Sequence, residues 1–393
     1  MWTKTPSNRI SVRMALSSLE SDWAWLPRNL LNSILDKVAS SPFDLVRFGV
    51  VCKPWHTVEI EYIQEKRRMK GQGNQVPMLL IPTKYKSKRA RSLYSITEQK
   101  IYHCKLRMPY NKRCCGSSFG WLSFVTDTFS ITLFNPLKNM KIHLPQLTKL
   151  KEPIYLILNY QYSVYKLTLS SDPAKTPTNC LVVAIYGSYN KLAFMKLGAE
   201  SWTYVDEELN ILFSDILFFK GQVLALGHHS GLVSIDVNSN EIKILVPNNL
   251  EYAIQTYLVD TCSGDLLLVR RFFDPNNRYS GSQSLTGSFK VYKFVLDDES
   301  GQVLDRVEVK TIGDNALFLG DNYSISVLAT ESPGCQPNSI YYTDDYIDTK
   351  PYYPDGAVDM GIFNLLDGSI QQHYKPKSSI KRMPPPIWIM LRL

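Results

Sequence analysis

The sequence lacks most of the short patterns that identify catalytic, metal-binding or membrane-spanning chains. Its 393 residues include seven cysteines, an odd number, and no CxxC pair that would begin a zinc ribbon. It has no P-loop, and its apolar runs, such as residues 181–186, are far shorter than a membrane span. We therefore expect no catalytic residue, no metal, no cofactor and no membrane contact, with reduced thiols in the cytoplasm or nucleus.

Acidic residues are missing from residues 66–91, a segment that holds nine lysines and arginines and so accounts for the whole net charge of +8. Such a run fits a nucleic-acid or nuclear-import patch as well as a solvated linker. It lacks the groove-entering helix of a nucleic-acid module. We therefore predict a basic linker over residues 64–91 and no nucleic-acid partner.

Acidic residues are also missing from the first nineteen residues, which carry Lys4, Arg9 and Arg13 among several serines and threonines. We predict a flexible tail over residues 1–22. The composition leaves a mitochondrial or plastid transit peptide open as the alternative.

Three short helices are predicted next. Apolar residues recur at helical spacing between residues 26 and 39, with Pro27 in the first turn, where its missing N–H costs nothing. The residues "SPFD" (41–44) then combine a capping serine with a proline and an acid, which predicts a second helix through Cys52. Pro54 can begin a third. A module of this size buries its apolar faces poorly, so we expect it to use a partner surface.

The order "WLPRNLLNSIL" and then "SPFDLVRFGVVCKPW" resembles the F-box over roughly residues 23–63. The resemblance implies that these helices dock a Skp-type adaptor and, through it, a cullin–RING ubiquitin ligase. Asn29 departs from the acid that family members often carry, but no apolar anchor is lost. The adaptor-binding residues that the resemblance implies are Leu26, Pro27, Leu30, Ile34, Leu35, Leu45, Phe48, Val51, Cys52 and Trp55.

Cys52 and His56 are four residues apart, a spacing that a metal or catalytic pair could use. Pro54 lies between them and breaks the helix, so the two side chains need not share a face. We predict that Cys52 is a small buried apolar residue.

The remainder of the chain consists of short strand-like runs separated by turns. For example, "GWLSFVTDTFSITLFNPLKNMKIHLP" (120–145) predicts three strands with turns at residues 126–128 and 135–136. Similar units recur at an irregular spacing of about 40 to 70 residues, which predicts the blades of a β-propeller and leaves their number open. A β-sandwich is the alternative fold.

The phrases "ALFLGDNYSISVLA" (316–329), "NSIYYTDD" (338–345) and "DMGIFNLLDGSI" (359–370) resemble plant F-box proteins that carry a KIB-type β-propeller. Ser339 stands where the family often has a cysteine. The resemblance implies a small all-α F-box (three-helix) module, then an all-β domain, a β-propeller, over residues 92–391. It also implies the non-catalytic substrate-recognition subunit of an SCF (Skp–cullin–F-box) E3 ubiquitin ligase, with a protein substrate on the propeller. A propeller that binds partners without ubiquitin transfer, or an organelle-targeted relative, is the alternative.

Three further groups of polar residues are candidate sites. His228 and His229 fit a turn before Gly231 better than a metal or acid–base pair. The acids at 344–345 and 355–359 lack the D-x-D-x-D-G pattern of a calcium loop, so we predict a solvated blade loop. The tyrosine-rich loop 340–356 has the composition of an interaction surface, although its tyrosines could instead fill the space between blades. The substrate-binding residues predicted there are Tyr341, Tyr346, Tyr352 and Tyr353.

Overall fold

The computed structural model separates into two compact units, residues 1–72 and residues 73–393, which we describe one at a time. Residues 1–21 of the predicted tail (1–22) and the predicted contact residues Tyr346, Tyr352 and Tyr353 lie outside the described residues. None of the described helices has the length and apolarity needed to span a lipid bilayer. The residues that the structure describes are 22–38, 42–49, 51–69, 76–82, 90–107, 112–149, 160–205, 211–239, 241–248, 253–275, 285–297, 302–345, 359–375, 384 and 386–390.

The first unit contains the three predicted helices, preceded by one 3-10 turn. They are η1 (Asp22–Trp25), α1 (Arg28–Val38), α2 (Pro42–Gly49) and α3 (Lys53–Met69). The carbonyl of Pro27 accepts hydrogen bonds from the N–H groups of Leu30 and Leu31 at 3.0 and 3.2 Å, so this proline begins α1 as predicted.

Two boundaries in this unit differ from the prediction. Helix α2 ends at Gly49 and not at Cys52, and glycine is a poor helix former. The position needs glycine, because a β-carbon there would overlap the carboxylate of Glu59 in α3. Helix α3 continues to Met69, so the first residues of the predicted linker are helical. Glu, Lys and Arg are good helix formers, and this composition extends the helix beyond its apolar part.

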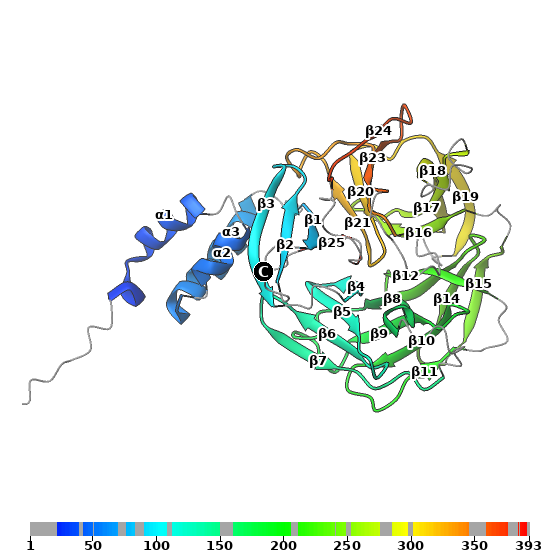
Figure 1. The fold of residues 1–393 in the computed structure, drawn as a ribbon, viewed down its shortest axis with the longest axis horizontal. Coiled ribbons are helices and arrows are strands. Elements are labelled where there is room, and N and C mark those ends of the chain that lie inside the picture. The colour runs from blue at the N-terminus through cyan, green and yellow to red at the C-terminus, as the bar shows by residue number, and fades with distance from the viewer. Residues whose placement is uncertain are drawn as a thin grey trace, which may run out of the picture. The chain divides into compact units, whose positions relative to one another are not determined.

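Among its described residues the second unit forms a ring of six β-sheets, which confirms the predicted β-propeller with six described blades (Figure 1). In each sheet neighbouring strands pair antiparallel, apart from one parallel pair in blade 6.

Blade 1 contains β1 (Met78–Pro82), β2 (Ala90–Ser95) and β3 (Lys100–Arg107), with β25 (Ile387–Ile389) as its innermost strand. Blade 2 contains β4 (Cys114–Ser118), β5 (Trp121–Val125), β6 (Ile131–Asn135) and β7 (Met140–His143). Blade 3 follows η2 (Tyr160–Tyr162) and contains β8 (Val164–Leu169), β9 (Leu181–Tyr186), β10 (Lys191–Lys196) and β11 (Thr203–Tyr204).

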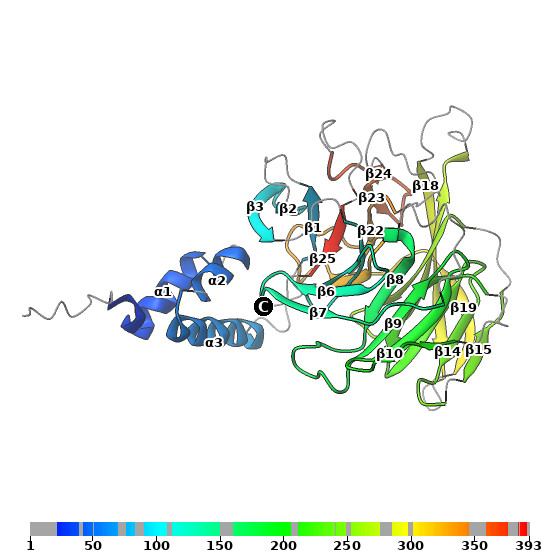
Figure 2. The same cartoon turned by 60° about the horizontal axis from the view of Figure 1, so that its bottom comes forward.

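The other three blades complete the ring, as the tilted view shows (Figure 2). Blade 4 contains β12 (Phe213–Phe219), β13 (Gln222–Gly227), β14 (Leu232–Ile235) and β15 (Ile242–Val246). Blade 5 contains β16 (Gln255–Asp260), β17 (Leu266–Phe273), β18 (Thr286–Leu296) and β19 (Val303–Val309). Blade 6 contains β20 (Asn315–Leu319), β21 (Ser324–Leu328), β22 (Ser339–Tyr342), β23 (Gly361–Asn364) and β24 (Ile370–Gln371), in the spatial order β21-β20-β22-β23-β24.

The propeller begins earlier than the predicted residue 92. Strand β1 lies inside the predicted basic linker and pairs with both β2 and β25. Its sequence is a continuous apolar run, typical of a strand buried on both faces, and so lacks the alternation by which half-buried strands are recognised. Arg91 was also predicted to lie in the linker, but it is part of β2 and is 1% exposed. It donates a hydrogen bond to the carbonyl of Lys112 at 2.6 Å. Burial lowers the pKa of this guanidinium.

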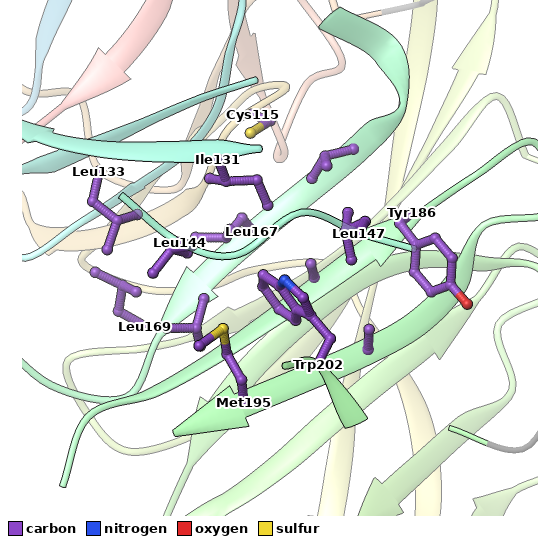
Figure 3. Packing of buried hydrophobic residues seen from close by; sticks show 14 of the residues in the cluster. Cys115, Ile131, Leu133, Leu144, Leu147, Leu167, Leu169, Tyr186, Met195 and Trp202 are labelled. Atoms are coloured by element: carbon purple, nitrogen blue, oxygen red, sulfur yellow. The ribbon is translucent and has the colours of Figure 1, made fainter. Parts of the chain in front are cut away.

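Neighbouring blades pack through apolar layers. Between blades 2 and 3 the buried cluster includes Ile131, Leu167 and Trp202, together with Leu144 and Leu147 from the segment after β7 (Figure 3). Each fully buried side chain of this size contributes about 1.5–3 kcal/mol. Because both faces of each sheet are covered in this way, the blades are stable only as parts of the ring.

The ring is closed by Trp388 in β25. Residues 387–389 pair antiparallel with Met78–Leu80, which places the last described strand inside the first blade. The Trp388 side chain is 0% exposed and donates its indole N–H to the carbonyl of Leu319 in blade 6 at 3.0 Å. Its own carbonyl accepts a hydrogen bond from Asn322 at 2.8 Å.

Replacing Trp388 with alanine is expected to lower the free energy of unfolding by about 3–5 kcal/mol, the usual cost of a large-to-small change in a core. Urea denaturation of the full chain measures this change. Leu366→Ala is the matched control, because Leu366 is 80% exposed and its loss should change stability by less than about 0.5 kcal/mol. Equal effects of the two substitutions would contradict the closure described here.

His373 makes the same closure sensitive to acid. Its Nε2 lies 3.0 Å from the carbonyl of Tyr342, its Nδ1 is buried without a hydrogen-bond partner among the described residues, and its ring centroid lies 5.6 Å from that of Trp388. Burial lowers the pKa of His373 to about 4, from an ordinary value of 6.5.

Between these two pKa values the unfolded chain binds a proton that the folded chain does not, so His373 makes stability fall as pH falls. Between pH 7.5 and pH 5 the wild type should lose about 2 kcal/mol more than His373→Phe. Denaturation at both pH values tests this, with His143→Gln, an exposed position in β7, as the control that should behave like the wild type. An identical loss in the wild type and His373→Phe would rule the effect out.

Candidate functional site

The residues assigned to adaptor contact by resemblance divide into three groups in the helical unit. Leu35, Phe48 and Trp55 are buried, at 0%, 5% and 8% exposure. Leu26, Ile34, Leu45 and Cys52 are partly buried and pack against that core. Pro27, Leu30 and Val51 are exposed.

The buried group forms the core of the unit and is not available on its surface. The Phe48 and Trp55 rings have centroids 4.5 Å apart, and both side chains belong to one cluster with Leu31, Leu35, Val58 and Tyr62. The Tyr62 hydroxyl donates to Asp36 at 2.7 Å, which ties α3 to α1. This corrects the assignment of Leu35, Phe48 and Trp55 as contact residues: their apolar area is used to hold the three helices together.

The exposed apolar side chains of the unit form the candidate docking surface. We name this set the helical apolar surface; it contains Trp23 (61% exposed), Trp25 (82%), Leu30 (48%), Val51 (55%) and Ile60 (41%). Three of the five, Trp23, Trp25 and Ile60, are absent from the residues assigned by sequence. The F-box resemblance assigns no adaptor contact to these three positions. A sequence also does not show which side chains are exposed.

Cys52 and His56 do not form a site together. Cys52 is partly buried against the helical core, as predicted, whereas the His56 side chain is 60% exposed and its Nδ1 lies 3.0 Å from the Glu59 carboxylate. Burial raises the pKa of Glu59, which is 5% exposed, and the contact with His56 opposes that shift. Among the described residues no group of three or more His, Cys, Asp or Glu side chains is arranged to hold a metal.

In the propeller, buried charges gather where the innermost strands begin. We name this group the inner polar cluster; it contains Arg113, Lys166, Asp215, Arg271, Asp321, Asp345 and Asp359. Sequence reasoning missed most of it. The available signal was a charge inside an otherwise apolar strand, such as Lys166 in "VYKLTL" or Arg271 in "LLLVRRFF".

Arg113, Lys166 and their partners connect five blades within this cluster, blades 2 to 6. Arg113 forms a bidentate pair with Asp321 at 2.6 and 2.7 Å and also donates to the carbonyl of Val164 at 2.8 Å. Lys166 lies 2.5 Å from Asp215, whose other oxygen accepts the N–H of Leu258 at 2.9 Å. The contacts join the starts of β4, β8, β12 and β16 to the turn before β21. They therefore hold these five blades to one another.

Arg271 is the most highly connected side chain of the cluster. It is 1% exposed and binds the carboxylates of Asp345 at 2.5 Å and Asp359 at 2.8 Å, and its Nε donates to Thr286 at 2.7 Å. Tyr257 donates its hydroxyl to the second Asp345 oxygen at 2.7 Å. Burial alone would lower the pKa of Arg271, but Tyr257, Asp345 and Asp359 raise it well above its usual value. The guanidinium is therefore permanently charged.

This geometry corrects two predictions for the C-terminal segment. Asp344, Asp345 and Asp359 are 5%, 1% and 7% exposed, so they do not belong to a solvated loop. Tyr341 is 1% exposed within β22, and its ring stacks on Phe318 at 4.5 Å. It belongs to a buried cluster that also contains Leu79 and Ile81 of blade 1, so it fills space between blades, the alternative considered for these tyrosines, and cannot contact a substrate. Burial raises the pKa of Tyr341 to about 12.

Two other motifs are hairpin turns. Residues 116–120 read "GSSFG" and match the spacing of a hydrolase nucleophile elbow, which sequence reasoning had not noted. They connect β4 to β5 without a helix, and Ser118 is 6% exposed beside Thr168, so the motif is a tight turn. His228 and His229 lie in the turn after β13, as predicted, and His228 Nε2 is 3.1 Å from the Asn190 amide.

Known proteins with similar sequences agree with this architecture. The family model described as the KIB1-4 beta-propeller matches residues 93–364. Three similar curated proteins from Arabidopsis thaliana are named F-box proteins. F-box protein At2g17036 is 24% identical over 94% of this chain and 95% of its own length. F-box protein SKIP23 is 24% identical over 94% and 95%, and F-box protein At4g35733 is 27% identical over 90% and 96%.

Replacing Arg271 with alanine is expected to cost about 3–5 kcal/mol of stability, because it leaves two buried carboxylates without their cation. Arg271→Lys should cost less but still destabilise, since one ammonium group lacks the planar fork that reaches both acids. Urea denaturation measures both. Lys310→Ala serves as control, because Lys310 is 84% exposed and its pair with Glu308 is a surface contact. A loss below about 1 kcal/mol for Arg271→Ala would show that the inner polar cluster does not hold the blades.

Proposed function

The chain belongs to the KIB1-4 β-propeller family, and on this basis we propose that it is the substrate-recognition subunit of a Skp–cullin–F-box ubiquitin ligase. One observation carries the proposal: a three-helix unit with an exposed apolar surface precedes a six-bladed propeller, in a chain whose F-box relatives align over nearly its whole length. The helical unit would be the F-box.

The helical apolar surface supports the docking role. Its members Leu30 and Val51, and Pro27 beside them in the F-box pattern, are exposed and so have free apolar area for an adaptor. Apolar area of this kind provides most of the free energy of protein association. The buried residues of the same pattern would act indirectly, by keeping the three helices packed.

The propeller would hold a protein substrate. Its described carboxylates in the inner polar cluster are already bound by cations or N–H groups, which suits a rigid scaffold. Ubiquitin transfer would then be promoted by proximity, because the complex raises the effective concentration of substrate lysines near the loaded enzyme. The bond-making residues would lie on other subunits.

Replacing Leu30 with aspartate in the full chain is expected to weaken binding of a purified Skp-type adaptor by at least about 30-fold, since a charge would enter a desolvated apolar contact. Val51→Asp should act in the same direction. Isothermal titration calorimetry measures both, and circular dichroism should show unchanged helix content because both side chains are exposed.

Leu366→Asp is the matched control, because it makes the same leucine-to-aspartate change at a propeller position that is 80% exposed. It should bind the adaptor like the wild type. Unchanged affinity in both helical variants, or no binding by the wild type, would remove the F-box assignment and favour a propeller that binds partners without ubiquitin transfer.

A further inference from the structure

The loop that connects β8 to β9 in blade 3, residues 170–180, carries a threonine directly before a proline. Residues 174–179 of this loop are all exposed, and Thr176 and Pro177 lie in the middle of that stretch, between two short turns. A proline removes a backbone N–H and keeps the residue before it near an extended conformation. Protein kinases take the hydroxyl residue in an extended segment, and the proline-directed class has a pocket for the ring that follows it.

Both ends of the exposed stretch are held by the propeller. Pro173 is buried, and Cys180 is 0% exposed. Ser170 donates its N–H to the carbonyl of Leu181 at 2.9 Å, and Leu181 donates its N–H to the Ser170 hydroxyl at 2.8 Å. The strands on either side are therefore fixed independently of the conformation of residues 174–179.

The hydrogen bonds described for the exposed stretch stay within the loop. The carbonyl of Asp172 accepts the N–H groups of Lys175 and Thr176 at 2.9 and 3.0 Å, and the carbonyl of Thr176 accepts the N–H of Asn179 at 3.2 Å. Segments that are held by few contacts open locally at a small cost in free energy. A kinase could therefore draw this stretch into its cleft without breaking a hydrogen bond of the sheet.

The loop is attached to blade 2 through Asp172 and not through Thr176. The Asp172 carboxylate accepts the indole N–H of Trp121 at 2.9 Å and lies 3.8 Å from the Lys138 ammonium group. The Thr176 hydroxyl donates to the hydroxyl of Ser171 at 2.7 Å, a contact between two side chains of the same loop. A phosphate on Thr176 would thus leave the attachment to blade 2 in place.

Two serines of the chain have one of the two features each. Ser332 precedes Pro333 but is 0% exposed. Ser369 lies in the exposed stretch 366–372 but precedes Ile370. Among the described residues, only Thr176 combines exposure of the hydroxyl residue with a proline directly after it.

We propose that Thr176 is a phosphorylation site for a proline-directed protein kinase, an inference that is independent of the proposed ligase function. The Thr176 oxygen forms a bond to the γ-phosphorus of Mg·ATP while the bond from that phosphorus to ADP breaks, and the hydroxyl proton passes to the catalytic aspartate of the kinase. The modification adds a charge of about −1.5 to −2 to the loop at pH 7.

The test incubates the full chain with Mg·ATP and a purified proline-directed kinase, in separate reactions with a mitogen-activated and a cyclin-dependent protein kinase. Mass spectrometry then follows the phosphate at each site with time. Thr176 should be labelled at least about 100-fold faster than Ser332, because Ser332 becomes accessible only on local unfolding. Ser369 should stay unlabelled. Thr5 and Ser41, which also precede prolines, lie outside the described residues and are quantified separately.

Two variants show whether the proline directs the kinase. Pro177→Ala should lower the rate at Thr176 by at least about tenfold, whereas Thr178→Ala, a change at the next exposed position, should stay within about twofold of the wild type. Circular dichroism should be the same for both. The proposal is overturned if neither kinase labels Thr176, if Pro177→Ala is labelled as fast as the wild type, or if Ser332 is labelled as fast as Thr176.

Discussion

Closure of the ring by three residues of β25 is the constraint on which the propeller depends. A blade buries one face against each neighbour, so a ring that stays open leaves two faces in water and loses the apolar layer between them. The chain solves this by giving blade 1 strands from both ends of the second unit, β1 and β25. Trp388 then bridges to blade 6 through its side chain and its carbonyl. The stability of every other blade is thereby coupled to the last described strand of the chain.

The inner polar cluster performs a complementary task. Apolar layers between sheets allow some sliding, because dispersion and hydrophobic contacts have little directional preference. The pairs made by Arg113, Lys166 and Arg271 are directional, and each joins two different blades. Buried ion pairs are weak evidence for stability as such, since desolvation offsets much of their attraction. Their consequence here is a defined register between blades, which a scaffold for binding another protein requires.

The helical unit is small, and the F-box pattern of its sequence marks residues that turn out to form its core. Leu35, Phe48 and Trp55 are among them. The apolar side chains that stay available to a partner are the exposed ones, Leu30, Val51 and the two tryptophans of η1. Core and contact are linked by one hydrogen bond, from Trp55 to the carbonyl of Trp23. Local order at the surface is therefore determined by packing beneath it.

The sequence by itself determined the helices, the hairpins and the class of fold, because helical spacing, strand alternation and turn residues are local properties that a few neighbouring positions encode. It recognised the turn at His228 and the hairpins of blade 2, and it missed β1, whose apolar run has no alternation. Only the tertiary structure decided which residues of each pattern are exposed. Asp345 and Tyr341 looked like loop residues and are buried, because Arg271 of blade 5 reaches Asp345 and apolar side chains of blade 1 pack in the same cluster as Tyr341. Burial and ion pairing depend on contacts between distant segments, and no local pattern records those.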